Sequence, residues 1–483
     1  MVSRLWMWVA ACLMAFSVLI GCTDGGDKSG AGNSRKSTEA QPDYEPLALI
    51  VHHTRGSHNL KPAAVRQLLA QGVDTWSDLG LSGGSVNVVA AGINDADNGD
   101  DAILTADSIK RLQNTDKVLQ RVRNNPDTLG LIPASAVDET VRTLTVGKRD
   151  PLRKPGKYRP KIPAEQPVGD VVTISVVGDI MLGRRVGDEL ARVGDPAAVL
   201  RPMADRLASA DVTIGNLEST LSKAGEPRQG TDSFGARPNV RKGLKLAGFD
   251  VLVLANNHLG DYGPKAMRDT FTRVRKGGFK HVGAGKNLKA ARSPAIVKRH
   301  NTRIGIIATE SIGETPAAKK TSAGTNRLNM PPRTGPMDKK ALDRIAADIA
   351  DLAADVDTVM VIPHWGTQYT NVPEKSQRRA ARRFIDAGAD MVIGGHPHWV
   401  QGWEQINGGL VVHSLGNFIF DMDFMRETQE GILLELVLWD GELKAAEPTP
   451  YVIGDDFAPR PAGGKRAHNI MAMIRETSRG PYN

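Results

Sequence analysis

Cysteine is nearly absent from this chain of 483 residues, which has only Cys12 and Cys22, both close to the N-terminus. Beyond Cys22 there is no thiol, so the folded part can have no disulfide, no cysteine nucleophile and no cysteine metal ligand. Any metal site must therefore be built from His, Asp, Glu and Asn side chains. Aromatic residues are also few, at 5%, whereas glycine is frequent, with 50 residues, which suits a fold with many tight loops.

The apolar run from Leu5 to Ile20 is short for a membrane-spanning helix, which needs about 20 residues. Together with Arg4 before it, the run is typical of a signal peptide, here residues 1–21. The segment LIGC (19–22), followed by polar residues, resembles a bacterial lipobox, in which the cysteine is acylated. We expect a lipid on Cys22, a flexible tether over 22–45, and a place on the extracytoplasmic side of the cell membrane. A plain secretion signal or an uncleaved anchor would fit the same run.

The formal net charge is +8, and it becomes +7 without Arg4, the only charged residue of the signal peptide. A basic envelope protein is attracted to anionic surfaces such as acidic polymers or lipid headgroups. A solvated basic surface without a partner explains the charge equally well. No nucleic-acid motif accompanies it, so nucleic acid is not an expected partner.

Length and pattern predict two domains. A small α/β domain is expected over 46–149, because strand-like runs at 47–53, 85–93 and 129–137 alternate with amphipathic helical segments. Its phrases VRQLLAQGVDTWSDLG and NNPDTLGLIPASAV resemble part of a periplasmic solute-binding protein of the phosphate-binding type. A linker rich in Pro, Lys and Arg follows at 150–170, then a main α/β domain at 171–455. The tail, 456–483, has no clear periodicity.

In the main domain, six apolar strand-like runs end abruptly in polar clusters. The clusters are GDIMLGR (178–184), GNLEST (215–220), ANNHLGD (255–261), HWG (364–366), HPHW (396–399) and GNFIFD (416–421). Residues just past the C-terminal ends of strands converge on one edge of an α/β sheet, so these clusters should meet in space. Carboxylates, carboxamides and imidazoles are the ligands of hard to borderline divalent ions. Each cluster alone could be a turn or a helix cap, but their combination predicts a metal site.

The same motifs resemble the capsule synthesis protein family of the CapA type, which is associated with poly-γ-glutamate production and related to calcineurin-like metallophosphoesterases. The resemblance runs from about 173 to 422 and includes ANNHLGDYG (255–263), HWGTQY (364–369) and GGHPHWVQG (394–402). It implies a four-layer α/β/β/α sandwich with a dinuclear metal site, holding two ions of Mn, Fe or Zn, at the sheet edge.

The resemblance also implies roles for individual residues. Asp179 and His398 would bind the first ion, Glu218 (or Asn216) would bridge the two, and Asn257, His364 and His396 would bind the second. His258 would be the general acid that protonates the leaving group, with Asp261 as its orienting partner. Asn216, Asn417 and Arg184 are candidate substrate-binding residues, although a surface salt bridge would explain Arg184 as well.

One departure bears on function. Phosphoesterases usually carry Asp-x-His in the first motif, whereas this sequence has Asp179-Ile180-Met181, so one histidine ligand is missing. The leading hypothesis is a lipid-anchored envelope protein that acts in the synthesis, export or attachment of an anionic polymer, as a metal-dependent hydrolase or transferase. Its partners would be that polymer, the membrane, and synthase or export components. The alternatives are a metallophosphoesterase for cell-wall or lipid phosphodiesters and a non-catalytic polymer-binding scaffold.

Overall fold

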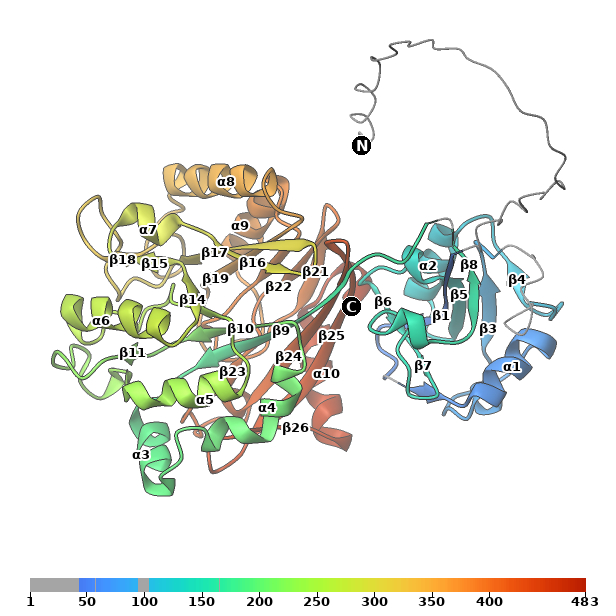
Figure 1. The fold of residues 1–483 in the computed structure, drawn as a ribbon, viewed down its shortest axis with the longest axis horizontal. Helices are drawn as coiled ribbons and strands as arrows, with labels where there is room; N and C mark the ends of the chain where they lie inside the picture. The colour runs from blue at the N-terminus through green and yellow to red at the C-terminus, as the bar shows by residue number, and fades with distance from the viewer. Residues whose placement is uncertain (1–42, 57, 94–103, 165) are drawn as a thin grey trace, which may run out of the picture. The chain divides into compact units, whose positions relative to one another are not determined.

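The computed structural model describes residues 43–56, 58–93, 104–164 and 166–483 (Figure 1). The predicted signal peptide, Cys22 and most of the predicted tether lie outside the described residues. Among the helices that are described, none is long and apolar enough to cross a membrane.

The N-terminal α/β unit is a small mixed sheet with the order β4-β3-β5-β1-β6 and with β8 also paired to β1. Its strands are β1 (Tyr44–His52), β3 (Asn87–Ala90), β4 (Lys110–Arg111), β5 (Thr128–Pro133), β6 (Val141–Thr143) and β8 (Lys161–Pro163). A two-stranded ladder joins β2 (Asn59–Leu60) to β7 (Thr145–Val146). Helices α1 (Pro62–Gln71) and α2 (Thr115–Asn124) bury their apolar faces in two separate clusters with residues of the sheet. Both helices fall within the segments 61–72 and 105–125, whose apolar spacing predicts amphipathic helices.

Two segments are more structured than the sequence suggested. The predicted extended linker, 150–170, contains a 3₁₀ turn (Pro155–Lys157) and β8, and the ring of Tyr158 is fully buried. The N-terminal unit therefore continues to β8 instead of ending at 149. The tail after 455 forms β26 (Pro459–Pro461), α10 (Gly464–Thr477) and a final 3₁₀ turn (Gly480–Tyr482). Because β26 pairs with β25, the main domain extends to the end of the chain.

The first sheet of the main domain has the order β14-β13-β10-β9-β24-β25-β26, with β23 also beside β9. These strands are β9 (Val171–Ile180), β10 (Val212–Leu217), β13 (Val251–Val253), β14 (Lys280–Val282), β23 (Asn417–Ile419), β24 (Glu430–Trp439), β25 (Glu442–Ile453) and β26. The strands β9, β10, β13 and β14 are parallel, whereas β24 runs antiparallel to β9. Almost all residues of the central strands are buried, which accounts for their nearly continuous apolar runs.

The second sheet has the order β16-β17-β19-β20-β22-β21. Its strands are β16 (Ala295–Arg299), β17 (Thr302–Glu310), β19 (Thr358–His364), β20 (Met391–Ile393), β21 (Trp403–Ile406) and β22 (Gly409–Val412). The four central strands β17, β19, β20 and β22 are parallel. Two short ladders complete the domain: β11 (Thr220–Leu221) with β12 (Gly235–Ala236), and β15 (Ala284–Gly285) with β18 (Gly324–Thr325).

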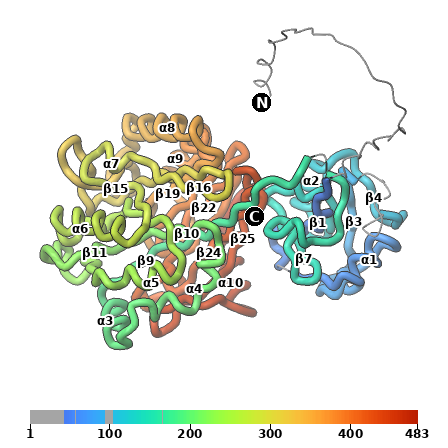
Figure 2. The backbone as a smooth tube through the Cα atoms, in the orientation of Figure 1, coloured from blue at the N-terminus to red at the C-terminus, as the bar shows by residue number. Residues whose placement is uncertain are grey.

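Three buried apolar clusters show how the sheets and helices pack. One cluster joins side chains of both sheets, among them Ile174 and Met360. A second joins the first sheet to α3 (Arg184–Val193), α4 (Arg201–Ala208), α5 (Arg241–Leu246) and α6 (Gly263–Lys276). A third joins the second sheet to α8 (Lys339–Ala353) and α9 (Lys375–Asp386), and a short α7 (Leu288–Arg292) packs on β15. Figure 2 shows α4 and α5 on one side of the domain and α8 and α9 on the other. The predicted mixed α/β fold is confirmed.

Candidate metal centre

The parallel strands of both sheets bring the predicted polar clusters to one place. Asp179 is the second-to-last residue of β9, and it pairs with Asn216 of the neighbouring strand β10. His364 ends β19, and His396 follows β20 after two glycines. Because the two sheets pack face to face, the ends of β9 and β10 meet the ends of β19 and β20, as the strand-end pattern predicted.

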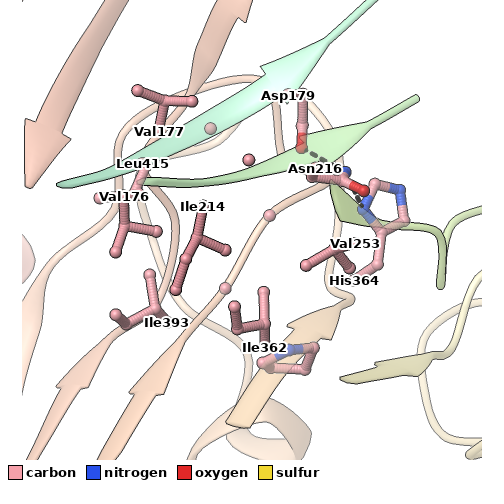
Figure 3. Close-up of a pocket in the computed structure, with 15 residues that line it drawn as sticks. Val176, Val177, Asp179, Ile214, Asn216, Val253, Ile362, His364, Ile393 and Leu415 are labelled. Atoms are coloured by element: carbon pink, nitrogen blue, oxygen red, sulfur yellow. Dashed lines mark hydrogen bonds between the residues drawn. The ribbon is translucent and has the colours of Figure 1, made fainter. Parts of the chain in front are cut away.

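A hydrogen-bonded chain crosses from one sheet to the other (Figure 3). Asn216 Nδ2 donates to Asp179 Oδ1 at 2.7 Å and lies 3.2 Å from His364 Nδ1. His364 Nε2 lies 2.8 Å from Asn257 Oδ1 and 3.2 Å from His396 Nδ1. All five side chains are buried, so their positions relative to one another are fixed by packing as well as by hydrogen bonds.

Three fully buried side chains present unpaired atoms to one another. One ligand atom each from Glu218, His396 and His398 lies within 4.8 Å of the other two. Among the residues that the structure describes, neither carboxylate oxygen of Glu218 has a hydrogen-bond partner, and neither does Nε2 of His396 or His398. Unpaired buried polar atoms are rare, and a buried carboxylate without a partner is especially unfavourable. A divalent cation would satisfy all of these atoms, so the donor set fits a metal ion.

Further donors surround this trio. Glu218 Oε1 lies 3.6 Å from His364 Nε2 and 3.8 Å from His258 Nε2. Asp179 Oδ2 lies 3.6 Å from His398 Nδ1 and accepts a hydrogen bond from the backbone N–H of His396 at 3.1 Å. The six predicted ligands are therefore brought together, and their roles as ligands to one ion or two stay predictions.

The backbone at the two central histidines adopts a conformation that L-residues rarely take. His396 has φ 96° and His398 has φ 59°. Such strain persists only where surrounding structure enforces it, and it concentrates at functional sites. The His-x-His loop is thus held in a costly conformation that turns both imidazoles inward.

The charges of the site are poorly compatible with one another in the absence of a cation. Burial, and then the nearby Glu218, raise the pKa of Asp179 to about 7, and burial raises the pKa of Glu218 to about 8. Burial lowers the pKa of His398 to about 3 and that of His396 well below its ordinary value. Neutral imidazoles are ready to coordinate a metal, and a cation between the carboxylates would favour their ionised form.

His258 occupies the edge of the cluster in an arrangement suited to proton transfer. Its Nδ1 lies 2.8 Å from Asp261 Oδ2, which fixes the ring orientation, and its ring stacks on Phe234 with centroids 3.5 Å apart. Burial alone would lower the pKa of His258, but Asp261 and the nearby Glu218 raise it above the ordinary value. The predicted pairing of His258 with Asp261 is present, and the role of acid stays a prediction.

Two of the predicted substrate-binding residues have other partners. Arg184 forms a bidentate ion pair with the buried Asp421. The structure therefore shows the salt bridge that was the alternative to substrate binding. Asn417 is fully buried, and its Oδ1 lies 2.8 Å from His398 Nδ1. Asn417 therefore orients a predicted metal ligand, and both polar atoms of its side chain are occupied by protein groups. Their assignment to substrate binding stays untested.

The sequence interpretation missed three residues that shape the site. Asn256 donates to Asn216 Oδ1 at 3.0 Å and to the backbone carbonyl of Leu217 at 2.9 Å, and it lies in the ANNH motif that predicted its neighbours. Asp421 ends the GNFIFD motif, which could have indicated it. Phe234 lies in a loop without any motif, and no sequence signal points to it.

Beneath the polar side chains, the space between the two sheets is apolar and almost filled. Val176, Ile214, Val253 and Ile362 are among the side chains that line it (Figure 3). The cavity holds about 10 Å³, room for about one water molecule at most. Substrate must therefore approach the metal centre from outside the sheets.

Known proteins are similar in sequence to the part of the chain that carries this site. The family model for the bacterial capsule synthesis protein PGA_cap matches residues 173–422. The capsule biosynthesis protein CapA of Bacillus anthracis is 30% identical over 325 residues, 66% of this chain and 76% of that protein. The PGA biosynthesis protein CapA of Bacillus subtilis (strain 168) is 32% identical over 314 residues, 64% of this chain and 78% of that protein.

Among solved structures, a novel phosphatase from Mycoplasma pneumoniae is similar with a TM-score of 0.38 and 13% identity, over 59% of this chain and 94% of that one. The family match, by contrast, spans just over half of the sequence and contains every predicted ligand of the metal centre. The chain belongs to the PGA_cap family of bacterial capsule synthesis proteins.

Proposed function

We propose that this protein is a metal-dependent hydrolase or transferase of the cell envelope that acts on an anionic polymer such as poly-γ-glutamate. It would be anchored by a lipid on Cys22 and would work on the extracytoplasmic side during synthesis, export or attachment of the polymer. The names of the two Bacillus relatives support the choice of polymer. The LIGC motif (19–22) supports the anchor.

The convergence of unpaired buried atoms from Glu218, His396 and His398 carries the proposal. A site that only held the fold together would pair these atoms with one another or replace them with apolar side chains. When bound, a divalent ion neutralises the carboxylates and acts as a Lewis acid on the substrate. Asp179, Asn257 and His364 would complete its coordination.

The residues around the ion would divide the remaining chemistry between them. In hydrolysis of a γ-amide, the acyl carbon gains an oxygen from water, the C–N bond breaks, and the amine departs with an added proton. His258 Nε2 faces the cluster and would give that proton, while Asp261 holds the opposite side of the ring. Phe234 covers one face of the imidazole and keeps water from it.

The first motif supports chemistry other than that of the phosphoesterases. Met181 stands where those enzymes usually carry a histidine ligand, and its side chain is fully buried in the apolar cluster under α3–α6. Its sulfur lies 3.1 Å from the backbone nitrogen of Gly183. Because the thioether of Met181 faces the apolar core, it does not supply the metal ligand that the histidine would provide at this position.

The test is direct. The chain without its signal peptide is loaded with Mn, Fe or Zn and incubated with poly-γ-glutamate, with and without an amine acceptor. New amino termini or acceptor-linked polymer should form with the native protein and disappear with Glu218→Gln, which keeps the shape of the side chain and removes its charge. A protein that binds metal but releases and transfers nothing under these conditions would refute the enzymatic proposal.

A further inference from the structure

A basic groove lies on the outer surface of the first sheet's helices, outside the metal centre. It is open to solvent and has a volume of about 1080 Å³. The residues that line it are Lys223, Arg237, Pro238, Asn239, Arg241, Lys242, Lys245, Leu246, Arg273 and Gly277. Six of these ten are Lys or Arg and none is acidic, so the groove presents charge of one sign.

Most of this charge is not neutralised. Arg273 is paired with Asp269 at 2.8 Å, and Arg241 donates to the backbone carbonyls of Pro238 and Arg273. The other four cations are exposed, and none forms an ion pair with any residue that the structure describes. These four are Lys223, Arg237, Lys242 and Lys245. Four unpaired cations in one concavity concentrate positive potential there and would attract a polyanion.

Two chain segments lead from the metal centre directly into the groove. Lys223 comes five residues after Glu218, and Arg237 comes three residues after Phe234, the ring that stacks on His258. Between them lies the parallel β11–β12 ladder, which pairs Thr220 with Gly235. A fully extended chain spans at most about 3.6 Å per residue, so the Cα atom of Lys223 lies within about 18 Å of the Cα atom of Glu218.

We propose that this groove binds a carboxylate-bearing polymer outside the metal centre and holds it near that centre. The inference rests on the proposed function in that the polymer is its substrate class. A linear polyanion carries many carboxylates and can pair with several of the exposed cations Arg237, Lys242 and Lys245 at once. A flexible chain can follow the concave surface of the groove, whereas a flat anionic membrane contacts fewer of its cations, so a flexible chain is the better occupant.

The experiment measures binding of fluorescently labelled poly-γ-glutamate by anisotropy at about 0.1 M salt, where charges more than about 10 Å apart are largely screened. The test variant is Arg237→Ala/Lys242→Ala/Lys245→Ala. Its matched control, Lys298→Ala/Lys320→Ala/Lys340→Ala, removes three exposed cations elsewhere and changes the net charge equally. Binding to phosphatidylglycerol vesicles and the metal content of each variant are measured in parallel.

The groove variant should bind the polymer at least about 10-fold more weakly than the native protein and keep its metal, while the control variant should bind as the native protein does. Equal loss in both triple variants would mean that net charge alone attracts the polymer, and no loss in either would remove the groove from binding. Either result overturns the inference, as does a groove variant that loses vesicle binding only. His396→Ala/His398→Ala should still bind the polymer. If the native, metal-loaded protein bound the polymer without turnover, the proposed function would be refuted while the groove assignment stayed intact.

Discussion

Asn417 illustrates how much a single buried hydrogen bond can matter at this site. Its carboxamide oxygen accepts from His398 Nδ1 at 2.8 Å, which leaves Nε2 free to face the metal. Partners of this kind fix the tautomer and orientation of a ligand. We expect Asn417→Ala to weaken metal affinity by roughly 10–100-fold. Asn417→Asp keeps an acceptor and should restore most of the affinity. Metal titration of both variants checks this, and a change in KM alone would instead place Asn417 on the substrate.

His258 should separate proton transfer from metal binding. Because its Nδ1 is held by Asp261 and its Nε2 lies 3.8 Å from Glu218, His258→Ala should retain metal. Turnover of poly-γ-glutamate, whose amine is a poor leaving group, should fall about 10²–10⁴-fold. A γ-glutamyl-p-nitroanilide, which has a better leaving group, should suffer much less. Loss of metal from this variant would make His258 a ligand.

At this scale the sequence was informative wherever a motif ended a strand. The clusters around Asp179, Asn257 and His396 were recognisable because strand ends converge on one edge whatever the detailed packing. Phe234 could not be predicted, because its contact with His258 depends on the path of a loop that has no motif. The role of Asn417 behind His398 was equally hidden, since it requires knowing which side of β23 faces the ligand.

The close approach of β9 to the loop before β23 depends on the absence of a side chain at Gly178, not on an unusual backbone conformation there. A Cβ atom on Gly178 would lie 1.9 Å from the backbone carbonyl oxygen of Gly416. Gly178→Ala must push these backbones apart, next to Asp179 and Asn417. We expect it to destabilise the protein by about 3 kcal/mol. Gly156→Ala, where a Cβ meets nothing within 4 Å, should change stability by less than about 0.5 kcal/mol. Urea denaturation compares the two, and equal midpoints would contradict the packing described here.

Helices and strands could be predicted where the apolar pattern was long, and they were missed where few of their residues are buried. The helices α1 and α2 fell within their predicted segments. The strands β9 and β19 formed on the predicted apolar runs 171–177 and 357–363 and continue into the polar clusters that follow. Helix α10 was not predicted because, within Gly464–Thr477, only Ile470 and Ile474 are buried, which leaves little amphipathic signal in the sequence. The segment β8 escaped because its flanking prolines and lysines have the composition of a linker, and only pairing with β1 makes it a strand.

For the whole molecule, the contact between the N-terminal unit and the main domain contains a buried carboxyl group. Glu139 is 7% exposed and accepts a hydrogen bond from Gln405 at 2.8 Å. Burial, and then the neighbouring Asp138, raise its pKa from 4.5 to about 7. The folded protein therefore binds this proton more tightly than the unfolded chain does. The contribution of Glu139 to stability is fully present below pH 4.5 and is lost as the pH rises through about 7.

Glu139→Gln should remove this dependence and keep the acceptor for Gln405. Between pH 4.5 and 8, the free energy of unfolding of the native protein should fall by up to about 3 kcal/mol relative to the variant. Titrations common to both proteins cancel in the difference. Urea denaturation at several pH values measures this difference in the free energy of unfolding. A difference that does not change with pH would show that burial does not raise the pKa of Glu139.

The arrangement of the whole molecule was the least predictable level. The order of strands in the two sheets depends on contacts between residues far apart in the chain, such as β9 with β24, and no local pattern encodes it. Family resemblance, not periodicity, supplied the expectation of two sheets between helices. The observed clusters agree with that expectation, and they explain why one site can draw ligands from both sheets.

The most direct test of the central claim is elemental analysis of the chain without residues 1–21, purified without chelators. We predict about two Mn, Fe or Zn ions per chain, lost in His396→Ala/His398→Ala and retained in His300→Ala/His468→Ala, which removes two exposed histidines instead. The fold, followed by circular dichroism, should persist in both variants. A native protein that holds no metal after incubation with these ions, or a ligand variant that holds as much as the native protein, would contradict the metal centre.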